Sequence, residues 1–324
     1  MHPITDLLQQ QTRQRDREEE YRGLFAATGL HKENLLFPIF ASDLAGRIEA
    51  MPGISLTPLD KISEHVEMIA GSGISSVVIF GIPKNRDRTG SSAAQSDGVA
   101  QQAVRMVKSV FGSSVSVVSD ICICQYNISG HCGIVRDGRV DNDSTLEILA
   151  EIAASHAEAG ADVVAPSSMM DGQVHAVRKA LDDRGLNARI LSYSAKHASS
   201  LYSPFRSAAF AKPNLNPDKS SYQLSYSNPR QAIREIETDI NEGADIVMIK
   251  PALAYLDLVR RAKDRFDFPL AVQNVSGEYA MIKAAAIRGW IDEEEWKVRM
   301  LASIKRAGAD MIISYFSLDA TKYL

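Results

Sequence analysis

Short β-branched apolar runs alternate with longer amphipathic stretches along most of the sequence, and this alternation limits the possible folds more than any other feature. We predict strands at 35–40, 75–82, 115–122, 162–166, 189–194, 245–251, 269–276 and 311–316. Helical patterns fill the gaps, for example at 146–159 and 229–242. Strands that alternate with helices pair in parallel. Eight such units most economically close into a (β/α)8 TIM barrel, and an open doubly wound sheet is the alternative.

The triplet Gly-Ala-Asp recurs at 160–162, 243–245 and 308–310, each time between a helical stretch and an apolar strand. A glycine suits the position just after a helix, where a left-handed backbone is common. The triplet therefore marks equivalent places in the repeat, and we interpret it as a favourable turn from helix to strand.

Two segments fall outside the repeat. Residues 1–32 are predicted to be an N-terminal arm that contacts another subunit, which leaves residues 33–324 for the barrel. Residues 212–228 are rich in Pro, Asn and Ser and are predicted to form a long loop. Long loops in compact domains are often functional, so this one is a candidate active-site lid.

Composition excludes several classes of function. The chain has 324 residues, a formal net charge of −4 and only 7% aromatic residues, which argues against a nucleic-acid partner. The first 22 residues lack the apolar core of a signal peptide. The longest apolar runs are too short to span a bilayer. We therefore expect a cytoplasmic protein with no membrane or nucleic-acid partner.

Two lysines lie at equivalent strand ends, where the chemistry of a (β/α)8 barrel collects. Lys250 ends an apolar strand, and Lys196 occupies the corresponding position one unit earlier. Burial should lower the pKa of Lys250 toward neutrality, and a neighbouring cation should lower it further. A neutral amine can attack a ketone and form a Schiff base. One terminal lysine is more often a surface residue, but the pair favours catalysis.

The chain has three cysteines, Cys122, Cys124 and Cys132, and an odd number does not make a closed disulfide framework. Alternate residues of a strand share a face, so Cys122 and Cys124 are predicted to point at one ion. Cys132 returns after a glycine-containing turn. Three thiolates suit Zn²⁺, and an open fourth position favours catalysis, although His131 is a possible fourth ligand. Three buried cysteines that act as small hydrophobic residues are the alternative.

Further polar groups follow the predicted strands or the loops beside them. Cations such as Arg206 and Lys219 can bind a substrate carboxylate. The other candidates at strand ends are Asp120, Ser167, Ser276 and Tyr315. A solvated surface role would explain any one of these residues taken alone, so their value as candidates comes from their positions.

Several segments resemble the porphobilinogen synthase family, also called 5-aminolevulinate dehydratases. They are 80–83, 120–133, 165–172, 192–206, 248–257 and 275–281. The likeness extends from about residue 35 to the C-terminus, and its motifs are specific to the family. The resemblance implies a (β/α)8 barrel with an N-terminal arm, usually assembled as a homo-octamer. It also implies a hydro-lyase of tetrapyrrole and heme biosynthesis that condenses two 5-aminolevulinate molecules into porphobilinogen.

The resemblance implies roles for individual residues. Lys250 corresponds to the lysine that holds the first, P-side substrate, and Lys196 to its A-side partner. The three cysteines correspond to ligands of a catalytic Zn²⁺. The remaining positions are Arg206, Lys219 and Gln223 for the A-side carboxylate, Ser276 and Tyr315 for the P-side carboxylate, Asp120 as a catalytic residue of the cavity, and Ser167 on the cavity wall.

Some positions depart from the family pattern and indicate a divergent member. Gln273 stands where the family has a tyrosine beside the P-side substrate. Lys219 replaces an arginine, and a lysine cannot make the two parallel hydrogen bonds that an arginine makes to a carboxylate. Ser129 replaces a histidine of the zinc loop. Ser168 replaces an aspartate associated with an effector Mg²⁺ in some members, although Glu235, the matching glutamate, remains.

These departures leave three hypotheses open. The favoured one is an authentic porphobilinogen synthase. The second is a paralogue with an altered substrate or product, because Gln273 and Lys219 occupy substrate positions. The third is a catalytically silent zinc-binding scaffold, against which the intact lysines and cysteines argue.

Overall fold

A closed barrel of parallel strands forms the centre of the computed structural model, which describes residues 28–209 and 218–324. In order around the barrel the strands are β1 (Leu35–Ser42), β4 (Ser76–Ile82), β5 (Ser116–Ile121), β8 (Val163–Pro166), β9 (Arg189–Lys196), β10 (Ile246–Lys250), β11 (Leu270–Gln273) and β12 (Met311–Ile313). Neighbouring strands pair in parallel, and β12 pairs back with β1. The (β/α)8 barrel is therefore confirmed, and the open sheet is excluded.

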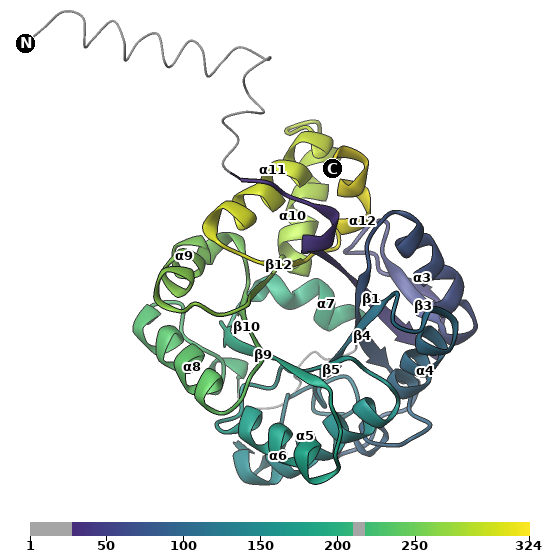
Figure 1. The fold of residues 1–324 in the computed structure, drawn as a ribbon, viewed down its shortest axis with the longest axis vertical. Helices are drawn as coiled ribbons and strands as arrows, with labels where there is room; N and C mark the ends of the chain where they lie inside the picture. Colours follow the sequence, from purple (N-terminus) through teal and green to yellow (C-terminus); the bar gives the residue numbers. More distant parts are fainter. Residues whose placement is uncertain (1–27, 210–217) are drawn as a thin grey trace, which may run out of the picture.

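Helices surround the strands, except for the short helix Ser203–Ala208, which lies within the ring in this view (Figure 1). They are α3 (Ile62–Gly71), α4 (Val99–Phe111), α5 (Asn142–Glu158), α6 (Gln173–Asp183), α7 (Ser203–Ala208), α8 (Pro229–Asn241), α9 (Leu256–Arg265), α10 (Ser276–Ile287), α11 (Glu293–Ala307) and α12 (Ser317–Ala320). Local sequence sets the starts of α5, α8 and α11, where an N-cap side chain accepts a backbone N–H. At α8, the Asn228 side chain accepts a hydrogen bond from the Gln231 N–H, and Pro229 occupies the first turn.

Short strands lie outside the eight-stranded ring. β2 (Gly46–Arg47) and β3 (Ser55–Pro58) extend the sheet beside β1, and β6 (Ile134–Arg136) pairs with β7 (Arg139–Asp141) as a hairpin. All eight residues of β1 are buried. Strands covered on both faces are apolar almost throughout, which explains why the apolar runs predicted the barrel strands well.

The three Gly-Ala-Asp triplets do more than turn the chain. Their glycines have φ of 103°, 101° and 124°, as expected for a left-handed position. Each aspartate accepts a backbone N–H at the start of the preceding barrel strand and pairs with a basic side chain of the helix before that strand. The partners are Val117 and Lys108 for Asp162, Ile190 and Arg178 for Asp245, and Leu270 and Lys263 for Asp310. Each carboxylate thus ties two successive units of the barrel together.

Replacing Asp245 with alanine is expected to lower the free energy of unfolding by about 1–2 kcal/mol, because Ile190 N–H and Arg178 would lose their acceptor. This loss is smaller than for a fully buried ion pair, because the Asp245 side chain is 40% exposed and solvent screens its charge. Asp183→Ala, which removes only a surface pair with Lys179, is the control and should cost less than about 0.5 kcal/mol. Urea unfolding measures both. Equal losses would contradict a special role for the triplet.

Four predicted boundaries are wrong at positions that concern the candidate site. The strand predicted at 189–194 continues to Lys196. β5 ends at Ile121, so Cys122 lies beyond the strand. β11 ends at Gln273, so Ser276 begins α10 instead of ending a strand. Tyr315 likewise follows β12, which ends at Ile313. Polar residues and turns after the last ladder hydrogen bond lie outside the apolar strand pattern, which makes such ends hard to place.

The predicted arm and lid fall largely outside the described residues, since 1–27 and 210–217 are not part of them. The described part of the lid begins with a short 3₁₀ turn, Lys219–Ser221, and Leu224 bridges His197 at the end of β9. The role of each segment stays a prediction. Among the described residues, no helix has the length and apolar character needed to cross a membrane.

Candidate active site

Lys196 and Lys250 lie side by side at the ends of adjacent strands. Lys196 is the last residue of β9 and Lys250 the last of β10, and the two are register partners in the parallel pairing. Their exposed fractions are only 8% and 6%. Lys196 Nζ donates to the Ser167 carbonyl, 2.5 Å away, just after β8. The structure thus brings both predicted lysines to the same end of the barrel.

Three aromatic rings enclose the amine of Lys250. Its Nζ lies 5.2 Å from the ring centroid of Tyr193, 5.3 Å from that of Tyr202 and 5.6 Å from that of Phe205. Burial lowers the pKa of Lys250 to about 7, and the charge of Lys196 acts in the same direction. Much of this amine is therefore neutral near pH 7, the form that attacks a ketone.

Asp120 faces the lysines from β5 and is buried. Burial raises the pKa of its carboxyl, and the Lys196 cation opposes that rise. Gln125 Nε2 donates to Asp120 Oδ2 at 2.9 Å, and the Ser167 hydroxyl contacts the same carboxyl. A carboxyl group held in this way beside two amines is suited to proton transfer.

The three cysteines converge in the loop after β5. Their sulfurs all lie within 4.8 Å of one another, and all three side chains are buried. The convergence was predicted, but the reason given for it was wrong, since Cys122 and Cys124 follow the strand and do not alternate along it. His131 is not part of this cluster; its Nδ1 lies 3.1 Å from the Tyr222 hydroxyl.

The charges around the cysteines fit a metal ion. Contacts from Cys122 and Cys124 lower the pKa of Cys132 well below that of a free thiol, and Lys219 acts in the same direction. Burial raises the pKa of Cys122 to about 12. Sulfurs around a tetrahedral Zn²⁺ lie roughly 3.8 Å apart at a Zn–S length of about 2.3 Å, which this cluster accommodates. Three buried sulfurs within reach of one ion, one of them with a lowered pKa, have the chemistry of a zinc site.

The predicted carboxylate-binding residues surround the lysines and the cysteines. Lys219 is buried, and its Nζ lies 3.7 Å from Cys132 Sγ. The positive charge of Arg206 acts to lower the pKa of Lys219. Within the described residues, Gln223 Oε1 and the Tyr315 hydroxyl are buried without a hydrogen-bond partner. Such groups are commonly satisfied by a ligand or by water. Ser276 differs, because its hydroxyl already donates to Leu201 O and accepts from Phe205 N.

Glu235 lies on α8 and lines a small cavity of about 50 Å³ with Asp171 and Asp239. Burial raises the pKa of Glu235, and the neighbouring Asp171 adds to the rise. Burial also raises the pKa of Asp239 to about 6. The Ser168 hydroxyl is fully buried and has no hydrogen-bond partner in the described chain. An effector Mg²⁺ at Glu235 stays a prediction.

Several residues of the site were not identified from the sequence. Gln125 links the cysteines to Asp120, because its Oε1 accepts from Cys124 Sγ while its Nε2 donates to Asp120. Tyr202 and Phe205 pack around Lys250. Their positions in the sequence could have identified them, since Gln125 adjoins Cys124 and the two aromatic residues lie in the segment 192–206 that contains Lys196.

The fold and this site define a barrel enzyme of the kind that forms Schiff bases with carbonyl substrates beside a thiolate metal site. Comparison with known proteins makes the class specific. The chain belongs to the delta-aminolevulinic acid dehydratase family, whose profile matches residues 9–323.

Two curated relatives carry the name delta-aminolevulinic acid dehydratase. The one from Archaeoglobus fulgidus is 49% identical over 95% of this chain and 96% of its own length. The one from Bacillus subtilis is 44% identical over 94% of each chain. A crystal structure of the enzyme from Toxoplasma gondii, in complex with the reaction product porphobilinogen, superposes with a TM-score of 0.94 at 35% identity and covers 96% of this chain and 90% of its own. These identities do not support the prediction of a divergent member.

Proposed function

We propose that this chain condenses two molecules of 5-aminolevulinate into porphobilinogen, the hydro-lyase reaction of porphobilinogen synthase in tetrapyrrole biosynthesis. The observation that carries the proposal is the pairing of Lys196 with Lys250 on adjacent strands, next to a buried three-cysteine cluster. A related structure of the same fold holds porphobilinogen as its reaction product. Family membership supports the same activity.

The lysines account for the covalent steps. The neutral amine of Lys250 attacks the ketone of the P-side substrate, and loss of water leaves a Schiff base. Lys196 holds the A-side substrate in the same manner. A Schiff base is a better electrophile than the ketone, and it acidifies the neighbouring carbon. One C–C and one C–N bond then join the substrates at the two imine carbons. Each lysine leaves as a free amine, and carbon-bound protons are lost to give the pyrrole. The two waters released when the Schiff bases form balance the reaction. Holding both substrates in place lowers the barrier by up to roughly 7–11 kcal/mol.

The surrounding groups orient the substrates and move protons. Asp120 exchanges protons near the lysines, and Ser167 lines the cavity. Arg206, Lys219 and Gln223 hold the A-side carboxylate, and Tyr315 with Ser276 holds the P-side one. For Ser276 this requires its hydroxyl to exchange the contacts it makes with Leu201 and Phe205. A Zn²⁺ held by Cys122, Cys124 and Cys132 would supply a Lewis acid for the A-side substrate.

Assembly, regulation and location extend the proposal. We propose a homo-octamer in which residues 1–32 form the arm that contacts another subunit. Residues 212–228 form the active-site lid. Glu235 is the carboxylate that matches the family pattern for an effector Mg²⁺. A cytoplasmic location agrees with the sequence. The resemblance to the family supports the arm and the octamer.

Purified protein incubated with 5-aminolevulinate is expected to form a pyrrole, measured by its colour reaction. The rate at subsaturating substrate should rise as the pH passes upward through about 7, because Lys250 loses its proton there and becomes nucleophilic. A trapped adduct without pyrrole would favour a paralogue with another product. Neither adduct nor turnover, with zinc bound, would favour a silent scaffold.

A further inference from the structure

A single tyrosine hydroxyl joins the backbone ends of the two lysine strands. Tyr202 Oη donates to the carbonyl of His197, the residue after Lys196, at 2.8 Å, and lies 3.2 Å from the carbonyl of Lys250 itself. The His197 N–H also donates to the Lys250 carbonyl at 2.9 Å. These bonds form the last link between β9 and β10.

The ring of the same residue contacts the reactive side chains. Its centroid lies 5.3 Å from Lys250 Nζ and 5.3 Å from Arg206 Cζ. Tyr202 is only 4% exposed. One side chain therefore touches the backbone of both lysine strands, the amine of one lysine and the guanidinium proposed to bind a carboxylate.

The segment that carries Tyr202 is itself held by hydrogen bonds with Ser199 and Ser276. Tyr202 ends the 3₁₀ turn Ser200–Tyr202, where the Ser199 side chain accepts from Leu201 N–H. Ser276, at the start of α10, donates to the Leu201 carbonyl. Gly277 permits this close approach, since a Cβ there would lie 2.6 Å from Leu201 Cα. The hydroxyl of Tyr202 is thus presented to the strand ends by a supported turn.

We propose that Tyr202 is a positioning residue that fixes the spacing of Lys196 and Lys250, so that the two bound substrates meet in the geometry needed to join them. The inference rests on the proposed function. Each lysine alone can form a Schiff base without this bond. Joining two substrates depends on their relative placement, and a shift of about 1 Å can cost roughly 10²-fold in rate.

Tyr202→Phe is the test, because it removes the hydroxyl and keeps the ring. Pyrrole formation should fall about 10- to 100-fold in kcat. Borohydride trapping of 5-aminolevulinate on Lys250 should stay within about twofold of wild type, since the pocket around the amine is retained. Hydrogen exchange at the His197 amide should accelerate about 3- to 10-fold, as expected when a bond at the end of the strand pair is lost.

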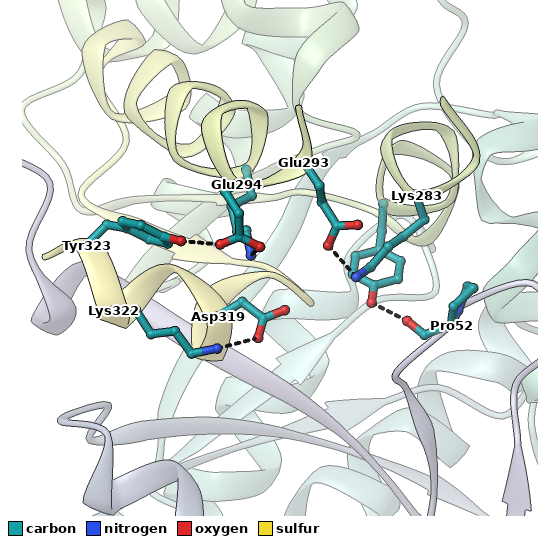
Figure 2. Close-up of polar contacts among 9 residues, drawn as sticks. Pro52, Lys283, Glu293, Glu294, Asp319, Lys322 and Tyr323 are labelled. Carbon is teal, nitrogen blue, oxygen red and sulfur yellow. Dashed lines mark hydrogen bonds and ion pairs between the residues drawn. The ribbon is translucent and has the colours of Figure 1, made fainter. Parts of the chain in front are cut away.

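Tyr279→Phe is the matched control. The Tyr279 hydroxyl also donates to a backbone carbonyl, that of Pro52 at 2.5 Å, a contact drawn beside Lys283 in Figure 2. This variant loses the same kind of bond but should keep its kcat and its exchange at His197.

Three outcomes would overturn the inference. They are equal kcat values for the two variants, unchanged exchange in Tyr202→Phe, or a parallel fall of trapping and turnover, which would indicate a merely structural loss. Failure of the proposed function would appear separately, as a wild-type protein that makes no pyrrole. The difference in hydrogen exchange at the His197 amide between Tyr202→Phe and Tyr279→Phe would still decide whether Tyr202 holds the strand ends.

Discussion

Lys250→Met should reduce pyrrole formation by roughly 10⁴-fold or more, the scale seen when the group that forms a covalent intermediate is removed. Methionine fills a similar volume and suits the aromatic rings of Tyr193, Tyr202 and Phe205 that surround the amine. The fold should therefore survive while the nucleophile is lost. Steady-state turnover and borohydride trapping followed by peptide mass spectrometry measure the two effects, and no adduct should appear at position 250.

Lys297→Met provides a matched control, because Lys297 is also buried, at 2% exposure, but lies on α11 and pairs with Glu294. Figure 2 shows Glu294 between the C-terminal elements, with the Tyr323 hydroxyl bonded to it. The control should retain turnover and lose only stability. Wild-type turnover in Lys250→Met, or a loss of the same size in Lys297→Met, would contradict the assignment of Lys250 as the nucleophile.

Cys132→Ala should abolish stoichiometric zinc binding and lower turnover by about 10²-fold or more, since even residues outside the ligand set change metal affinity by 10- to 100-fold. The pKa of Cys132 is lowered by the neighbouring cysteines and by Lys219. Without it, only two of the three clustered sulfurs remain to hold the ion. Zinc content after dialysis, measured by elemental analysis, gives a result that does not depend on activity.

His131→Ala distinguishes a local disturbance of the loop from the loss of a ligand. His131 adjoins Cys132 but contacts the Tyr222 hydroxyl and is not part of the sulfur cluster. This variant should retain one zinc per chain. A chelator should reproduce the Cys132→Ala phenotype in the wild-type protein, and added zinc should reverse it. Retention of zinc by Cys132→Ala would exclude the three-thiolate site.

The sequence predicted the barrel because its strands are buried on both faces. A strand such as β1 or β10 consists almost entirely of apolar residues, and amphipathic helices separate these runs, so each unit can be recognised locally. The same rule placed Lys250, since a charged residue that ends an apolar run marks the strand end. Lys196 was predicted at the corresponding position one unit earlier, although the predicted strand 189–194 is two residues shorter than β9. In a parallel barrel, equivalent ends lie on one face.

Loops and contacts between distant segments were not predictable in this way. The cysteines converge because the loop after β5 brings them together, and not because they alternate along a strand. The cluster was therefore predicted correctly, but its structural cause was not. Ser276 is predicted at a strand end, yet it is the first residue of α10, and its hydroxyl donates to Leu201 O in the turn that ends at Tyr202. The bridge made by Gln125 depends on side-chain directions that no sequence period specifies.

By itself, the sequence determined the alternation of strands and helices, the family, and the residue types that carry the chemistry. These follow from local patterns of burial and from motifs that can be read in order along the chain. Only the tertiary structure decided how the chemistry is tuned, because the pKa of Lys250 depends on burial and on a cation from the segment 192–206, which is distant from Lys250 in the sequence. The link made by Tyr202 across β9 and β10 is of the same kind, since it exists only once these two strands have paired.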